Sequence, residues 1–159
     1  MAVAVTGATV DPKNGGPHSA VTFDRLEDWT TRPEPGIRYY SGTAEYTRTF
    51  DWRAATGFPP RVWLALGRVE NIAGVTVNGV PCGVAWTAPW RVDITAALKH
   101  GTNELRIAVT NTWANRLIGD HALPEAQRIT WTTAPYRGEH TGLLPAGLLG
   151  PVTILEDSR

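Results

Sequence analysis

The sequence contains a single cysteine, Cys82, among its 159 residues. One cysteine forms no internal disulfide, and together with four scattered histidines it provides no cysteine-rich zinc site. Small secreted scaffolds that depend on disulfides are therefore excluded. A single cysteine leaves the redox compartment of the protein open.

The chain also lacks an excess of either charge. Fifteen Lys and Arg residues balance fifteen Asp and Glu residues, which gives a formal net charge of zero. A nucleic-acid-binding domain needs a basic surface to neutralise phosphates, and a polybasic membrane-surface protein needs clustered cations. We therefore expect neither nucleic acid nor a membrane as a partner.

Long hydrophobic runs are absent as well. No apolar stretch approaches the roughly 20 residues of a membrane-spanning helix. The opening residues 1–6 have neither the charged region nor the long apolar core of a signal peptide. Hydrophobic residues still make up 42% of the chain, and seven are Trp, so a disordered chain is excluded. We expect one domain over residues 20–159, after an N-terminal loop or tail over residues 1–19.

The pattern of the remaining sequence is typical of an all-β protein. Sixteen glycines and twelve prolines separate short segments, as in a β-sandwich or barrel. In the first clear segment, Ala44, Tyr46 and Phe50 alternate with polar residues, which predicts a strand with one exposed face. The predicted strands are Thr43–Phe50, Arg61–Leu66, Ala73–Val77, Val80–Trp86, Glu104–Val109 and Val152–Leu155, with a weaker signal over Arg128–Thr132.

Four local features refine this pattern. Asn78-Gly79 tolerates positive φ at both positions and predicts a tight hairpin. Pro81 donates no hydrogen bond to a β-ladder, so the returning strand is expected to be an edge strand or to contain a bulge. Residues 93–99 predict one helical turn, and the long segment 111–141 is expected to be mostly loop.

An ordered series of motifs resembles a known domain. The series is Val75-x-Val77-Asn78-Gly79, Trp86-Thr-Ala-Pro89-Trp90, Asp93-Ile94-Thr95, Leu98-Lys99-x-Gly101-x-Asn103-x-Leu105 and Val109-x-Asn111. It is similar to the sugar-binding jelly-roll domain of large glycoside hydrolases such as β-galactosidases and β-glucuronidases. The resemblance implies a jelly-roll β-sandwich of the galactose-binding-like class.

Three further blocks resemble a narrower group. Residues 37–46, 111–120 and 147–152 look like the C-terminal β-sandwich of α-L-rhamnosidases of glycoside hydrolase family 106. This resemblance, over residues 20–155, implies an accessory domain beside the catalytic domain of a parent enzyme. It also implies secretion or a periplasmic location through that enzyme. Folds of this type often hold one structural calcium ion, for which the sequence assigns no ligands.

The seven Trp residues are the most informative feature of the composition. A sugar stacks an apolar C–H face on an indole, while its hydroxyls need planar donors and acceptors. Four of them are expected in packing roles, as core or as lids over the core: Trp29, Trp52, Trp63 and Trp90. The candidates for an exposed sugar-binding surface are Trp86, Trp113 and Trp131, and the alternative for each of them is a partly buried anchor for its loop.

The segment from Trp113 to His121 is the strongest single candidate site. The resemblance places it in a loop that projects toward the neighbouring active site. Its polar side chains suit sugar hydroxyls or a uronate carboxylate, with Arg116 as a bidentate donor. The polar residues of this candidate site are Asn115, Arg116, Asp120 and His121. Tyr136 is a further candidate, in a second polar cluster. The structural alternative is an Arg116–Asp120 pair that pins a long loop.

No catalytic motif accompanies these residues. A glycosidase needs two carboxylates at a set separation, and none of the fifteen acidic residues lies in such a motif. The sequence also has no Gly-x-Ser-x-Gly elbow, phosphate loop or His-Glu-x-x-His motif. The leading interpretation is a monomeric, non-catalytic carbohydrate-binding domain of a polysaccharide-degrading glycoside hydrolase, which binds plant or pectic glycan. The alternative is a structural module that docks on its parent enzyme and binds no sugar.

Overall fold

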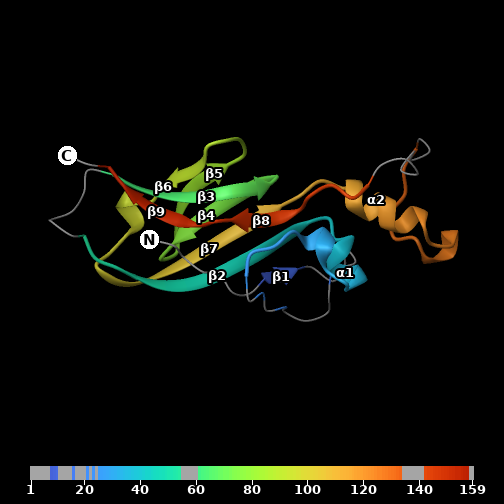
Figure 1. Cartoon of the computed structure of the whole chain (residues 1–159), viewed down its shortest axis with the longest axis horizontal. Coiled ribbons are helices and arrows are strands. Elements are labelled where there is room, and N and C mark those ends of the chain that lie inside the picture. Colours follow the sequence, from blue (N-terminus) through green and yellow to red (C-terminus); the bar gives the residue numbers. More distant parts are fainter. Residues whose placement is uncertain are drawn as a thin grey trace.

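The structure is a computed structural model that describes residues 8–10, 16, 21, 23, 25–54, 61–133 and 142–157. Its strands form two antiparallel sheets that face each other (Figure 1). The strands are β1 (Ala8–Val10), β2 (Thr43–Trp52), β3 (Val62–Glu70), β4 (Ile72–Val77), β5 (Val80–Ala85), β6 (Trp90–Asp93), β7 (Gly101–Thr110), β8 (Gly147–Gly150) and β9 (Thr153–Glu156). The predicted all-β sandwich is confirmed.

The larger sheet has the order β1-β2-β7-β4-β5, and the smaller has the order β6-β3-β8, with β9 also paired to β3. In the larger sheet, β2 and β7 pair along ten residues, from Thr43 opposite Thr110 to Trp52 opposite Gly101. Neighbouring strands far apart in sequence are thereby joined, as expected for a sandwich rather than a series of hairpins.

Three strands differ from the sequence prediction. Residues 8–10, expected in a loop or tail, form β1 because the free edge of β2 offers them an antiparallel partner. Trp90–Asp93 and Gly147–Gly150 pair with β3 as β6 and β8, although their Pro- and Gly-rich surroundings gave no strand signal. Short strands of four residues carry too little periodicity to be recognised without their partner.

Alternation along the strands builds the core. On β7 the buried residues are Asn103, Leu105, Ile107 and Val109, while each residue between them is more exposed. Burial of the three apolar side chains among these, Leu105, Ile107 and Val109, contributes about 1.5–3 kcal/mol each relative to exposure. Trp29 and Trp52, predicted as packing lids, are 2% and 3% exposed.

The prediction of Trp63 as a core residue is wrong. Val62, Leu64 and Leu66 face the other sheet, so Trp63 points to the outer surface and is only partly buried. There the guanidinium carbons of Arg91 and Arg61 lie 4.7 and 5.8 Å from its ring centroid. An apolar run does not reveal that arginine stems cover one of its faces. Trp90 is also partly buried, against the edge of the core.

The hairpin between β4 and β5 follows the prediction. Asn78 and Gly79 have φ values of 52° and 79°, as their turn requires. The register shifts between Val75 and Thr76, opposite Gly83 and Pro81, so the strand that contains Pro81 has a bulge. It also lies at the edge of its sheet, where a missing donor is tolerated.

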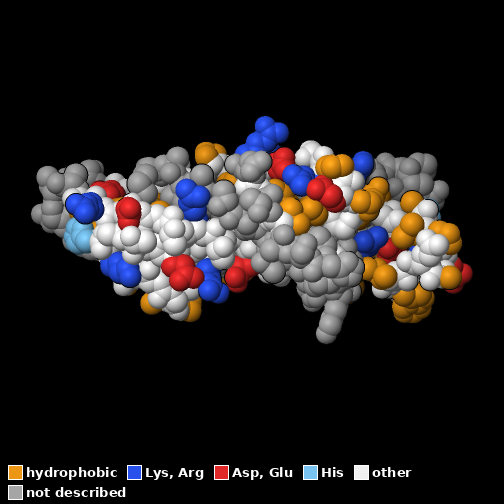
Figure 2. Space-filling view, turned by 90° about the horizontal axis from the view of Figure 1, so that it is seen from below, with side chains coloured by type: hydrophobic (Ala, Val, Ile, Leu, Met, Phe, Trp, Pro, Cys, Tyr) orange, Lys and Arg blue, Asp and Glu red, His pale blue; other side chains and the backbone are white. Residues whose placement is uncertain are grey.

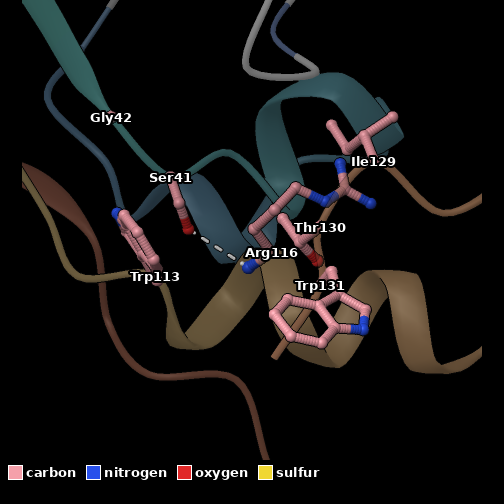
Figure 3. A pocket seen from close by; sticks show the side chains of 7 residues that line it. All are labelled: Ser41, Gly42, Trp113, Arg116, Ile129, Thr130 and Trp131. Carbon is pink, nitrogen blue, oxygen red and sulfur yellow. Dashed lines mark hydrogen bonds between the residues drawn. The ribbon is translucent and has the colours of Figure 1, made fainter. Parts of the chain in front are cut away.

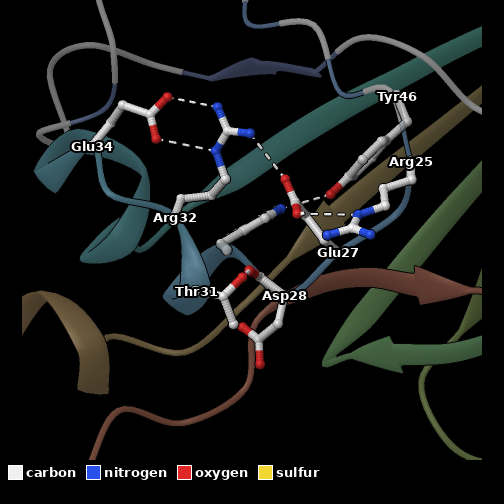
Figure 4. A network of polar contacts seen from close by, with 8 residues as sticks. Arg25, Glu27, Asp28, Thr31, Arg32, Glu34 and Tyr46 are labelled. Carbon is white, nitrogen blue, oxygen red and sulfur yellow. Dashed lines mark hydrogen bonds and ion pairs between the residues drawn. The ribbon is translucent and has the colours of Figure 1, made fainter.

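The segment before β2 is tied down by polar contacts (Figure 4). Arg32 forms ion pairs with Glu27 at 2.9 Å and Glu34 at 2.6 Å, and its hydrogen bonds hold the pKa of Glu34 below its usual value. Trp29 donates from its indole Nε1 to the Tyr46 hydroxyl at 2.6 Å. This segment contains the 3₁₀ turn η2 (Trp29–Thr31) and helix α1 (Pro35–Arg38), and it leads directly to the residues beside the candidate site.

Candidate functional site

Residues expected to be a loop after β7 form helix α2 (Ala114–His121) at one end of the molecule (Figure 1). Its N-cap, Trp113, makes no capping hydrogen bond with its side chain. The Ser41 hydroxyl accepts from the backbone N–H of Arg116 at 3.1 Å, so a residue 75 positions away satisfies one of the free donors. The sequence around the helix therefore lacks the usual start signal.

Asp120 fixes the chain that returns past α2. Its Oδ1 pairs with Nη2 of Arg116 at 2.7 Å, four residues earlier on the helix. Its Oδ2 accepts from the backbone N–H groups of Ile129 and Thr130 and from the Thr130 hydroxyl. These N–H groups bind a carboxylate rather than a neighbouring strand, which explains why the predicted strand Arg128–Thr132 is absent. A 3₁₀ turn, η4 (Glu125–Gln127), precedes this segment.

Asn115 is also engaged within the fold. Its Nδ2 donates to the carbonyl of Leu144 at 2.7 Å, and its Oδ1 accepts from the Leu144 N–H at 2.8 Å. The side chain is buried and its amide is used on both sides. The expectation that Asn115 contacts a sugar therefore disagrees with its geometry, because it anchors the segment that leads to β8.

These contacts shape an open cleft of about 460 Å³, here called the α2 cleft (Figure 3). Seven residues line it: Ser41, Gly42, Trp113, Arg116, Ile129, Thr130 and Trp131. Trp113 is 73% exposed and Trp131 is 82% exposed, so both indoles are accessible to a ligand. The volume of the α2 cleft lies within the range of about 300–1,000 Å³ that small-molecule sites occupy.

The structure brings together four of the predicted site residues. Trp113, Arg116 and Trp131 line the α2 cleft, and Asp120 lies directly behind Arg116. Trp86 is 72% exposed but does not line the cleft. His121 is exposed at the end of α2, also outside the lining.

Tyr136, in the second polar cluster, lies outside the described residues. The opposite wall of the cleft was not predicted from the sequence. Ser41 and Gly42 belong to the turn before β2, and Asn111 holds that turn by accepting from Gly42 N–H and donating to the Tyr40 carbonyl. Asn111 was part of a recognised motif, so its position after a strand was the available signal. Its contacts over about 70 residues were not readable from local sequence.

The electrostatics of the cleft are those of a neutral binding surface. Arg116 is compensated by Asp120, and the ion pair is almost fully buried, with 11% and 4% of the two side chains exposed. The Nε of Arg116 is buried and has no hydrogen-bond partner among the described residues. Within the described ranges, no group of three or more His, Cys, Asp or Glu residues is placed to hold a metal ion.

Comparison with known proteins identifies the domain. Residues 30–141 match the family described as the glycosyl hydrolase 2 galactose-binding domain-like family. The chain belongs to this family. The galactose-binding-like fold expected from the motif series is thereby confirmed, and the two-sheet architecture agrees with it.

Two larger proteins each contain a region similar to this galactose-binding-like domain. A rhamnosidase from Novosphingobium sp. PP1Y contains a region with a TM-score of 0.86 and 43% identity, which covers 99% of this chain and 15% of the rhamnosidase. A Formosa agariphila protein named "Putative beta-glucuronidase" is 37% identical over 158 residues, which is 84% of this chain and 14% of that protein. The chain thus spans about one seventh of the length of each relative.

A Ruminococcus gnavus β-glucuronidase shares the fold at a TM-score of 0.56 and 20% identity, over 69% of this chain and 20% of that one. At this identity the likeness concerns the fold alone. The galactose-binding-like domain is therefore of the kind found in large glycoside hydrolases. In the described part of the chain, no helix has the length and apolar character needed to span a membrane.

Proposed function

We propose that this domain binds carbohydrate, with the α2 cleft as the binding site and a plant or pectic glycan as its ligand. The domain itself carries out no chemistry and positions the glycan near the catalytic domain of a parent glycoside hydrolase, such as an α-L-rhamnosidase. The observation that carries this proposal is the pair of accessible indoles beside one arginine in a cleft of about 460 Å³.

The lining supplies the two kinds of contact that a sugar needs. Trp113 and Trp131 offer apolar ring faces for C–H groups, and the Arg116 guanidinium lies beside Ile129 in Figure 3. The Arg116 guanidinium donates to sugar hydroxyls, and the Thr130 hydroxyl, which gives its own proton to Asp120, accepts from them. Asp120 holds Arg116 in place, so little side-chain freedom is lost when the ligand binds.

A second candidate function is docking on the parent enzyme. Hydrophobic side chains gather at the end of the molecule that carries α2 (Figure 2). Ile129 is 56% exposed and Leu144 is 48% exposed, in addition to the two cleft indoles. Exposed apolar patches often mark protein interfaces, so the same surface would suit a neighbouring domain.

The substitution Trp113→Ala separates these roles from a merely structural one. Removal of an indole that the ligand covers is expected to weaken glycan binding by about 10- to 100-fold, since such burial is worth about 1.5–3 kcal/mol. Trp86→Ala is the matched control, because Trp86 is equally exposed but lies outside the cleft. Affinity-gel retardation and Trp fluorescence with pectic, arabinogalactan and xylan polysaccharides measure both variants, with and without calcium.

Equal affinity of Trp113→Ala and the parent chain for a retained glycan would disprove the assignment of the cleft. If no polysaccharide in the panel is retained, sugar binding is disproved and docking is favoured. Docking predicts concentration-dependent self-association of the isolated domain, or binding to the catalytic domain in trans, and Trp113→Ala would weaken either.

A further inference from the structure

The outer face of the larger sheet contains a second hollow, of about 540 Å³, here called the sheet trough. It is formed by one row of residues across four strands. Glu45 on β2 lies opposite Ala108 on β7, Ala108 lies opposite Gly74 on β4, and Gly74 lies opposite Val84 on β5. The trough shares no lining residue with the α2 cleft.

The hollow exists because the two central residues of the row are small. Neither Ala108 nor Gly74 has a side chain beyond Cβ, so the middle of the row is lower than its ends. A Cβ placed on Gly74 would meet no atom within 4 Å, and the φ angle of Gly74 is not positive. Backbone geometry therefore does not require glycine at this position, and a larger side chain would project into the trough.

The two walls differ in chemistry. On one side, Arg106 lies between Glu45, at 3.5 Å, and Glu104, at 2.9 Å, and about half of each of these side chains is exposed. On the other side, Pro81 and Val84 form an apolar wall, and Val84 is 62% exposed. A ligand in the trough meets charged hydrogen-bonding groups along one edge and hydrocarbon along the other.

We propose that the sheet trough is a second carbohydrate-binding site, specific for a neutral glycan chain that crosses the strands. Sugar hydroxyls donate to the carboxylates and accept from the guanidinium, while C–H groups pack on valine and proline. Two carboxylates and one guanidinium leave a net charge of −1, which disfavours uronates. The proposal does not depend on the α2 cleft.

The wall composition favours a glycan over a protein partner. Charged residues are depleted at the centres of protein interfaces, because a protein surface seldom replaces the water around each of them. A hydroxyl-rich chain supplies hydrogen bonds to all three charged groups. The recessed floor also suits a narrow chain better than a flat interface.

The test uses the whole chain labelled with ¹⁵N and four hexasaccharides: three neutral ones derived from xylan, arabinan and galactan, and acidic hexagalacturonate. At least one neutral hexasaccharide is expected to shift the amide signals of Gly74 and Ala108 saturably, with hexagalacturonate at least about tenfold weaker, a difference of about 1.4 kcal/mol. Gly74→Phe, which fills the trough, is expected to remove these shifts. Trp131→Ala, which alters only the α2 cleft, and Asp51→Ala, at an exposed position outside both hollows, are expected to retain them.

A second variant tests the same site in case Gly74→Phe does not fold. Glu45→Gln keeps the size of an exposed side chain and removes one charge, so neutral-glycan binding is expected to weaken and the preference against hexagalacturonate to shrink. The proposal is overturned if no neutral hexasaccharide shifts the two amides. It is also overturned if Trp131→Ala removes the shifts, or if the catalytic domain of a parent enzyme rather than a sugar causes them.

Discussion

Replacement of Asp120 by Ala is expected to lower the free energy of unfolding by about 3–5 kcal/mol, the cost of leaving a buried charge without its partner. The pair it breaks is nearly inaccessible to water, with 11% of Arg116 and 4% of Asp120 exposed. The same change leaves the N–H groups of Ile129 and Thr130 without an acceptor. Two walls of the α2 cleft would thus be released together, so glycan binding should be lost as well.

Chemical denaturation monitored by Trp fluorescence measures this effect. Asp51→Ala is the control, because Asp51 is exposed and its carboxylate accepts from the Thr102 hydroxyl at the surface. That substitution should cost about 1 kcal/mol or less. A loss below about 1 kcal/mol for Asp120→Ala would mean that the ion pair contributes nothing beyond a surface pair.

Gly67→Ala is expected to destabilise the sandwich by about 3 kcal/mol or more, because two penalties combine. Gly67 has a φ of 70°, in the left-handed region. A Cβ there would lie 2.2 Å from the carbonyl carbon of Gly150, which is backbone and has little room to move. The clash lies where β3 pairs with both β6 and β8.

Gly74→Ala is the matched control for this substitution. It makes the same chemical change in the same fold, without a positive φ and without an atom within 4 Å of the new Cβ. It should leave the free energy of unfolding unchanged or raise it by about 0.4–1 kcal/mol, because alanine restricts the unfolded chain. Equal effects of the two substitutions in thermal and denaturant unfolding would contradict the close approach of β3 and β8.

The sequence predicted the long strands well because each carries its own periodic pattern. Thr43–Phe50 and Glu104–Val109 alternate cleanly, and both lie inside the observed β2 and β7. The secondary-structure prediction failed where an element depends on partners that are distant in the sequence. β1, β6 and β8 are short and exist through pairing, and α2 receives its cap from Ser41.

Only the part of the candidate site that is contiguous in sequence could be predicted, because the remaining contacts join distant residues. Trp113 lies three residues before Arg116 and Asp120 lies four residues after it, so local sequence was enough to group the three. Trp131 joins them because Asp120 anchors the two residues before it, a contact with no sequence signal. Residue type also did not show that the Asn115 amide forms hydrogen bonds with the backbone of Leu144 and is therefore not available to a ligand.

The α2 cleft is proposed to bind glycan through its two indoles. The most direct test records the Nε1–H signals of the seven Trp side chains in a ¹H–¹⁵N spectrum during titration with the glycan that the affinity gels retain. Saturable shifts of Trp113 and Trp131 are expected, while Trp86 and the buried Trp29 and Trp52 stay unchanged. Shifts confined to Trp86, or binding without any change at Trp113 and Trp131, would contradict the proposal.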